Sequence, residues 1–191
     1  SQAAYVTRFR SSLSGGQVHK VQLSGMSLAK TVALAVDTTT QDDESRSRGV
    51  PNYLSQVVIS PDGMRAALPS KKDNIVRGRA RDGNDLLHDR TVRSIMSQID
   101  LQSDAERFNE QLDFDDRAPA RAAVYAPRGD FIFVAQMEGN NVAIVDAYSR
   151  AIRGEIMVAG LSAPHGLHLD AARNRMFVNN FLGRSVSVFD V

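Results

Sequence analysis

Two copies of one hydrophobic pattern occupy the C-terminal part of the chain. Phe131–Asp146, FIFVAQMEGNNVAIVD, aligns without a gap on Arg175–Asp190, RMFVNNFLGRSVSVFD, at an offset of 44 residues (175 − 131). Each copy is an apolar run, a polar turn that contains Gly139 or Gly183, and a second apolar run. Such runs are typical of strands covered on both faces, and Gly and Asn suit tight hairpin turns. The pattern therefore predicts a repeated β-hairpin.

The segments around each hairpin extend the repeat to four strands. An apolar strand precedes each copy, within Pro119–Gly129 and Pro164–Asn174. A more polar strand follows the first copy, within Arg150–Gly160, as expected for an outer strand with one face in water. Four strands with a period in the low forties are typical of a β-propeller blade. We therefore predict an all-β fold made of propeller blades.

Weaker copies of the same plan lie upstream. Ser55–Ser70 has a strand, a turn and a strand, and Ser94–Asp100 supplies a third strand that ends on Asp100, as the other copies end on Asp146 and Asp190. Further strands are expected within Glu106–Phe114, Ala3–Phe9, Gln17–Leu23 and Ser27–Val36. Helical spacing of Val92, Ile95, Met96 and Ile99 also allows a short helix in this region, but the repeat favours the strand.

The predicted organisation is a single propeller segment over residues 1–191. It comprises a partial blade at 1–36, a blade at 51–114 with a long insertion at 69–93, a blade at 119–160 and a partial blade at 164–191. About three to four four-stranded blades are too few for a closed ring, and both ends of the chain fall inside a blade. We expect a piece of a larger propeller, whose exposed end faces pack against the remainder of the ring or self-associate.

Two polar segments interrupt the repeat, Asp37–Val50 and Pro69–Arg93. Long loops in compact domains are often functional. One interpretation of the second segment is a solvated flap whose charges pair internally. The other is a docking surface for an acidic partner. The candidate docking residues are Lys71, Lys72, Arg77, Arg79 and Arg81. No aromatic residues alternate with these cations, so a nucleic-acid platform is not predicted.

Composition narrows the function classes. Lys and Arg number 23 against 22 Asp and Glu, which gives no global electrostatic case for binding nucleic acid or an anionic membrane. No apolar run approaches the roughly 20 residues of a membrane-spanning helix. The chain has no Cys, so disulfides, thiolate metal sites and CxxCH haem attachment within it are excluded. The N-terminus has no initiator Met and no signal-peptide pattern, so a processed chain is expected.

Few side chains suggest chemistry. His165 begins a first strand, which places it at the mouth of the central channel, where it either contacts a ligand or hydrogen-bonds a neighbouring turn. Asn179 and Asn180 follow a second strand and either bind a ligand or cap the hairpin. His165 and His168 are expected on opposite faces of their strand, so no metal site is predicted. No catalytic constellation is evident, and enzymatic activity stays open.

Several short sequences resemble those of a known family. YVT, VVISPDG, APHGLHLD and FVNNFLGRSVSVFD resemble the YVTN-repeat propellers, which are seven-bladed, lactonase-like or cytochrome d1-like domains of bacterial extracytoplasmic proteins. The resemblance covers nearly the whole chain and is strongest over Arg121–Val191, whereas Arg8 departs from the YVTN signature. PSKKDNIVRG together with FVNNFLGRSVSVFDV is similar to the propeller region that precedes a dihaem cytochrome c peroxidase (MauG-like) module.

This resemblance implies a seven-bladed ring, a periplasmic or extracellular location, and a redox protein whose haem lies in another domain. The favoured hypothesis is a non-catalytic propeller segment that serves as a scaffold or docking domain for the remainder of the propeller, another domain or an acidic redox partner. The alternative is a small-molecule-binding or lactonase-type hydrolytic propeller with its site at the central channel.

Overall fold

The computed structural model describes residues 2–115, 117 and 119–191, and within them the chain forms four antiparallel sheets. The first sheet contains β1 (Ala3–Thr7), β2 (Gly16–Gln22) and β3 (Ser27–Leu34). The second contains β4 (Val50–Asn52), β5 (Val58–Ile59), β6 (Arg65–Asp73), β7 (Val92–Asp100), β8 (Ala105–Glu106) and β9 (Leu112–Asp113). The third contains β10 (Ala120–Tyr125), β11 (Phe131–Gln136), β12 (Asn141–Asp146) and β13 (Ile152–Met157). The fourth contains β14 (Pro164–Asp170), β15 (Arg175–Asn180) and β16 (Ser185–Asp190). The predicted all-β fold is confirmed.

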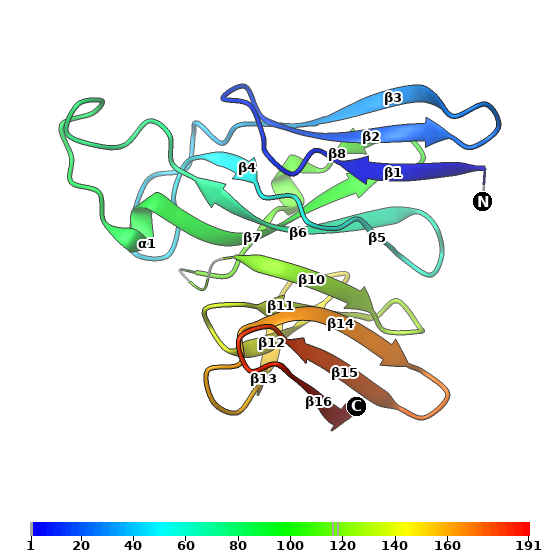
Figure 1. The fold of residues 1–191 in the computed structure, drawn as a ribbon. Coiled ribbons are helices and arrows are strands. Elements are labelled where there is room, and N and C mark those ends of the chain that lie inside the picture. The colour runs from blue at the N-terminus through cyan, green and yellow to red at the C-terminus, as the bar shows by residue number, and fades with distance from the viewer. Residues whose placement is uncertain (1, 116, 118) are drawn as a thin grey trace.

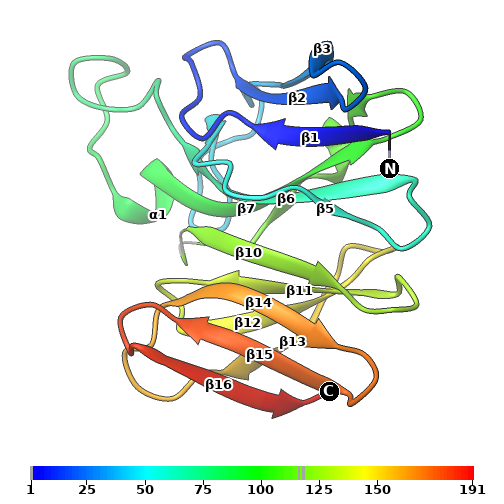
Figure 2. The same ribbon diagram turned by 45° about the vertical axis from the view of Figure 1, so that its right-hand side comes forward.

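The sheets are stacked in chain order (Figures 1 and 2). Each gap between neighbouring sheets is filled by one apolar cluster. Val18 and Leu34 of the first sheet pack with Leu54, Leu68 and Ile99 of the second. The other two gaps are filled in the same way, by Met96 and Phe114 with Ile132 and Val134, and by Phe133 and Val142 with Met176 and Val178. Burial of each large side chain contributes roughly 1.5–3 kcal/mol, so sheet-on-sheet packing is the main source of stability.

The register of the repeated hairpin is the same in three sheets. Arg65 pairs with Asp100, Phe131 with Asp146, and Arg175 with Asp190. Asp146 Oδ1 accepts the backbone N–H groups of Ser149 and Tyr148, at 2.9 and 3.1 Å. Asp100 Oδ1 accepts those of Ser103 and Gln102 at 2.9 and 3.0 Å. These two repeated carboxylates therefore stabilise the turns that follow their strands, as architectural residues do.

The strand prediction for Ser94–Asp100 is confirmed. The helical part of this region is limited to the short helix α1 (His88–Thr91), which precedes the strand, and β7 begins at Val92. Residues Arg93 to Gln98 are all almost fully buried, because sheets lie on both faces of β7. Four of these buried residues, Arg93, Ser94, Ser97 and Gln98, are polar, so the apolar residues of β7 do not mark both covered faces and their spacing also fits a helix.

Two boundaries in the second sheet differ from the sequence prediction. β6 and β7 stay paired as far as Asp73 and Val92, so the loop spans only 74–91 instead of the predicted insertion 69–93. The fourth strand expected within Glu106–Phe114 is broken into β8, a 3-10 turn η1 (Phe108–Glu110) and β9, both strands pairing with β7. None of the helices in the described residues has the length and apolarity needed to cross a membrane.

Candidate ligand and partner site at the hairpin end

The loops of three hairpins lie at the same end of the stack of sheets. We call it the hairpin end, formed by loops 74–91, 137–140 and 181–184, and it lies at the left in Figure 1. The starts of β10 and β14 lie at the same end, because Ala120 pairs with Gln136 and Pro164 with Asn180. Asn140 Oδ1 accepts the backbone N–H groups of Ser162 and Ala163, at 3.0 and 2.8 Å, and so ties the third sheet to the fourth here.

A bulge occurs at the same place in two first strands. The pairing register shifts between Ala120 and Ala122, and again between Pro164 and Gly166. The bulged residues are Arg121 and His165, which are one repeat apart (165 − 121 = 44). Aligning Pro119 with Pro164 by sequence places His165 opposite Ala120, whereas the strand register matches His165 with Arg121. A bulge changes the direction in which a side chain points, and both bulges lie where β10 and β14 begin.

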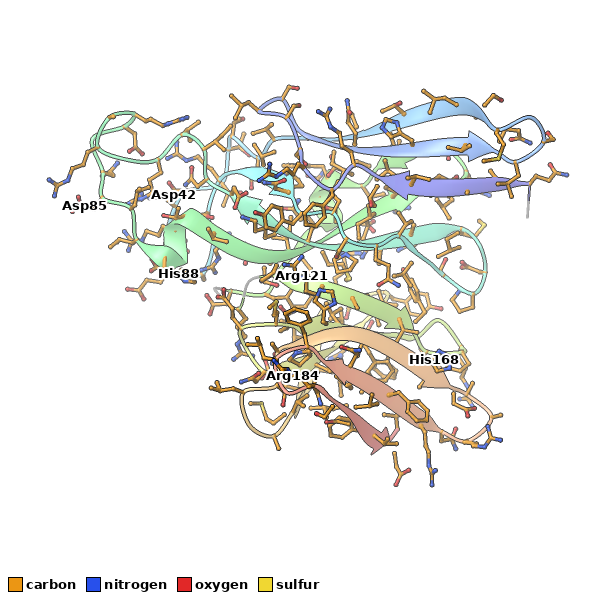
Figure 3. All side chains as sticks on the ribbon, viewed as in Figure 1. Asp42, Asp85, His88, Arg121, His168 and Arg184 are labelled. Atoms are coloured by element: carbon orange, nitrogen blue, oxygen red, sulfur yellow. The ribbon has the colours of Figure 1, made fainter. Side chains whose placement is uncertain are left out.

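Arg121 belongs to an aromatic and cationic cluster that the sequence analysis missed. The Phe9 and Tyr53 rings stack with centroids 4.8 Å apart, and Tyr53 has a positive φ of 55°. Lys71 Nζ lies 4.1 Å from the centre of the Tyr53 ring, and Arg121 Cζ lies 5.8 Å from it. Figure 3 labels Arg121 near the hairpin end of β10. The offset of 44 from His165 was the one sequence signal that pointed to Arg121.

The two cations in this cluster have different electrostatic environments. Lys71 Nζ donates to Asp73 Oδ1 at 2.7 Å, so an adjacent carboxylate compensates its charge. The Arg121 guanidinium makes no hydrogen bond or ion pair within the described part of the chain, and its Nε is buried without an acceptor. The Arg121 backbone is fixed by Ser55, whose hydroxyl donates to the Arg121 carbonyl at 2.7 Å.

The predicted ligand residues of the fourth sheet share the hairpin end, but their side chains differ in exposure. His165 is exposed and its ring lies 5.5 Å from that of Phe181. Partial burial and the nearby Arg121 charge lower the pKa of His165. Asn179 is exposed, whereas Asn180 is 2% exposed and donates to Ser187 Oγ at 2.8 Å. Asn180 therefore braces the hairpin, and His165 and Asn179 are the residues that an incoming molecule can reach.

The predicted docking cations divide into buried and exposed groups. Lys72 is 3% exposed and its Nζ lies 3.1 Å from Asp37 Oδ2. Arg77 is also buried, where its Nε donates to the Asp85 carbonyl at 2.8 Å and its Nη1 to Asp42 at 3.4 Å. Arg79 and Arg81 are exposed, and Lys71 is half-buried. Arg79 pairs with Asp85 at 2.6 Å, and Arg81 donates to the Ile75 carbonyl.

Asp42 is the centre of the buried ion pairs beneath loop 74–91. It accepts from Arg48 at 2.7 Å and from Asn74 at 3.0 Å. Burial acts to raise the pKa of Asp42, but the hydrogen bonds from Arg48 and Asn74 outweigh burial and lower it to about 2. An open polar cavity of about 450 Å³ adjoins this cluster. It is lined by Thr38, Thr39, Thr40, Gln41, Asp42, Arg48, Arg77, Asn84 and Arg90.

In residues 2–115, 117 and 119–191, no group of three or more His, Cys, Asp or Glu side chains is placed to hold a metal ion. His168 lies beside the Phe177 ring, with centroids 6.2 Å apart. The accessible groups of the hairpin end are therefore suited to binding anions and aromatic or polar groups, through Arg121, Lys71, Tyr53 and His165.

Comparison with known proteins identifies the fold. No protein-family model matches the chain, and no curated protein matches it. Among solved structures, it is similar to hydrazine synthase of Kuenenia stuttgartiensis, with a TM-score of 0.60 and 12% identity over 100% of this chain and 68% of that one. It is also similar to the WD40 repeats of RRP9, with a TM-score of 0.57 and 10% identity over 98% of this chain. The chain spans 47% of the RRP9 structure. WD40 repeats are propeller blades, and the predicted β-propeller segment is confirmed.

Proposed function

We propose that this chain is a non-catalytic propeller segment that acts as a scaffold and binds a partner at its hairpin end. The observation that carries the proposal is Arg121, a half-buried cation that lies over the Tyr53 ring near the start of β10 and has no anionic partner among the described residues. The β6–β7 hairpin also supports the proposal. Its strands stay paired beyond Lys71, so this hairpin projects further at the hairpin end than the hairpins of the third and fourth sheets.

The finer assignment within this proposal is a bacterial extracytoplasmic, redox-associated protein. It is supported by the resemblance of PSKKDNIVRG and FVNNFLGRSVSVFDV to propellers that precede a dihaem peroxidase module. A periplasmic or extracellular location follows from the same resemblance. A covalently attached haem of the CxxCH type would belong to another domain, because this chain has no Cys.

Photo-crosslinking in the native host tests the partner-binding role. A photoreactive residue replaces Arg79 or Arg81 at the hairpin end, and in control variants it replaces Arg128 or Arg173, which lie in turns at the opposite end. All four side chains are exposed, so each substitution leaves the core intact. We expect one discrete crosslinked species from the hairpin-end variants. Equal or stronger crosslinking from the opposite end would refute binding at the hairpin end.

A second candidate function is small-molecule binding or lactonase-type hydrolysis at the channel. This function is favoured because His165 and Asn179 are adjacent on paired strands. The two residues that flank His165, Pro164 and Gly166, pair with Asn180 and Asn179. Lactone hydrolysis is measured with and without added divalent metal, for the native chain and for His165→Ala. Metal-dependent turnover that is lost in the variant would establish this function, and absence of turnover in the complete protein would remove it.

A further inference from the structure

We propose that Arg121, flanked by Lys71 and His165 over the Tyr53 ring, binds a carboxylate side chain of an acidic peptide segment in a partner protein. This inference rests on the proposed function and names the partner chemistry of the same site. In this proposal, the acidic partner is recognised by a bulged residue on β10, the first strand of the third sheet, and not by the arginines of loop 74–91.

The charge balance of the hairpin end selects Arg121. Lys72 and Arg77 are buried with Asp37 and Asp42, and Arg79 is paired with Asp85. Lys71 is likewise compensated, by Asp73 at 2.7 Å. Arg81, Arg184 and Arg121 have no anionic partner in the described residues, but Arg81 and Arg184 are exposed to solvent. Arg121 differs because it is half-buried, its Nε is buried without an acceptor and its cation faces an aromatic ring. A partner carboxylate would supply the acceptor that Arg121 lacks, in a charge-assisted and potentially bidentate contact.

The surroundings fix the Arg121 backbone and the aromatic ring that its guanidinium faces. The Ser55 hydroxyl bonds the Arg121 carbonyl, and Phe9 stacks on Tyr53, which forms the platform beneath both cations. Tyr53 has a positive φ, and its backbone N–H donates to Asn52 Oδ1 at 2.9 Å. The opposite flank carries His165 and Phe181, 5.5 Å apart. A pre-organised side chain loses little conformational entropy on binding.

The openness of the site indicates a peptide as its occupant. Phe9, Ser55 and His165 are all exposed, so the site is a shallow rim that a side chain can approach from solvent. Enclosed concave pockets suit small ligands, whereas rims with a fixed cation suit protruding carboxylates of a protein surface. The β6–β7 extension beyond Lys71 offers an adjacent wall along which a peptide backbone can lie.

The experiment measures binding of a fluorescent hexapeptide of alternating Glu and Leu to the full chain by anisotropy at low salt. The comparison peptide alternates Gln and Leu. Arg121→Gln removes the proposed contact, and Arg121→Lys keeps the charge without the planar fork. Arg128→Gln is the matched control in the turn that follows the same strand, β10. Thermal unfolding of every variant checks that the fold is retained.

We expect Arg121→Gln to weaken binding of the Glu peptide roughly tenfold or more, because a charge-assisted hydrogen bond is lost. Arg121→Lys should lie between wild type and Arg121→Gln, Arg128→Gln should match wild type, and the Gln peptide should bind weakly to all. Equal loss in Arg121→Gln and Arg128→Gln would overturn the proposal, as would binding of glutarate as tight as that of the peptide. If crosslinking places a partner at the hairpin end while Arg121→Gln has no effect, the scaffold function stands and this inference fails.

Discussion

The side chain of Glu106 shows how one residue couples the first two sheets. Its Oε2 accepts the Ala35 backbone N–H at 2.6 Å, which joins the segment after β3 to β8. Burial raises the pKa of Glu106 to about 7, against the opposing effect of the Ala35 hydrogen bond. Its Oε1 is buried without a hydrogen-bond partner in the described residues. An ionised Glu106 is therefore costly in the folded chain.

The pH dependence of stability follows from this shift. Because the pKa in the folded state exceeds the usual value of 4.5, the folded chain binds more protons, and the Glu106 contribution to stability falls as the pH rises from about 4.5 through about 7. Glu106→Gln keeps an acceptor for Ala35 and removes the titration. We expect the variant to gain on the order of 1–2 kcal/mol over wild type between pH 5 and pH 8. Urea unfolding at both pH values measures it, and a pH-independent difference would contradict it.

At the scale of elements, the β6–β7 hairpin depends on ion pairs that cross long sequence separations. Lys72 Nζ lies 3.1 Å from Asp37 and 3.8 Å from Asp113, and the Lys72 and Asp37 side chains are almost fully buried. Burial raises the pKa of Asp113, and the neighbouring Arg93 and Lys72 oppose that shift. The hairpin is thus tied both to the linker after the first sheet and to the broken fourth strand of its own sheet.

Lys72→Met tests the importance of this connection. The substitution preserves much of the side-chain volume but leaves Asp37 and Asp113 with less compensation, and breaking a buried pair costs about 3 kcal/mol or more. Arg79→Gln is the matched control, because its exposed pair with Asp85 contributes roughly 0–1 kcal/mol. Chemical denaturation compares the two variants. Similar small losses in both would show that the buried pair does not stabilise the hairpin.

The elements that the sequence could predict are those with local causes. The 44-residue repeat, the Asp100, Asp146 and Asp190 registers and the strand β7 all follow from periodicity and turn chemistry. The extension of β6 and β7 to Asp73 and Val92 could not be predicted, because polar residues there pair with Asp37, far away in sequence. The residues of the candidate site could be predicted only in part. His165 marked the hairpin end, but the contact of Arg121 with Tyr53 joins two sheets and has no local signature.

At the scale of the whole molecule, equivalent positions of the third and fourth sheets differ in exposure, because the described chain places a sheet beside the outer face of the third but not of the fourth. Val142 of the third sheet is 0% exposed and Ile144 is half-buried, because the fourth sheet covers them. One repeat later, on the corresponding face of the fourth sheet, Val186 and Val188 are 59% and 51% exposed. An apolar sheet face of this kind is an association surface in water. This face of the fourth sheet has the apolar composition of an interface between two propeller blades.

If equivalent positions have equivalent partners, the isolated chain should bind a second copy through this face. Val186→Asp with Val188→Asp places charges on it, and because both side chains are exposed, the double variant should keep the fold of the single chain. Circular dichroism checks that fold.

Sedimentation velocity over a wide range of protein concentration is the most direct test that the chain is an arc of a propeller whose end face packs on another blade. We predict concentration-dependent association for the native sequence and a monomer for the Val186→Asp, Val188→Asp variant. A single monomeric boundary for the native sequence at every concentration, together with cooperative unfolding, would contradict it.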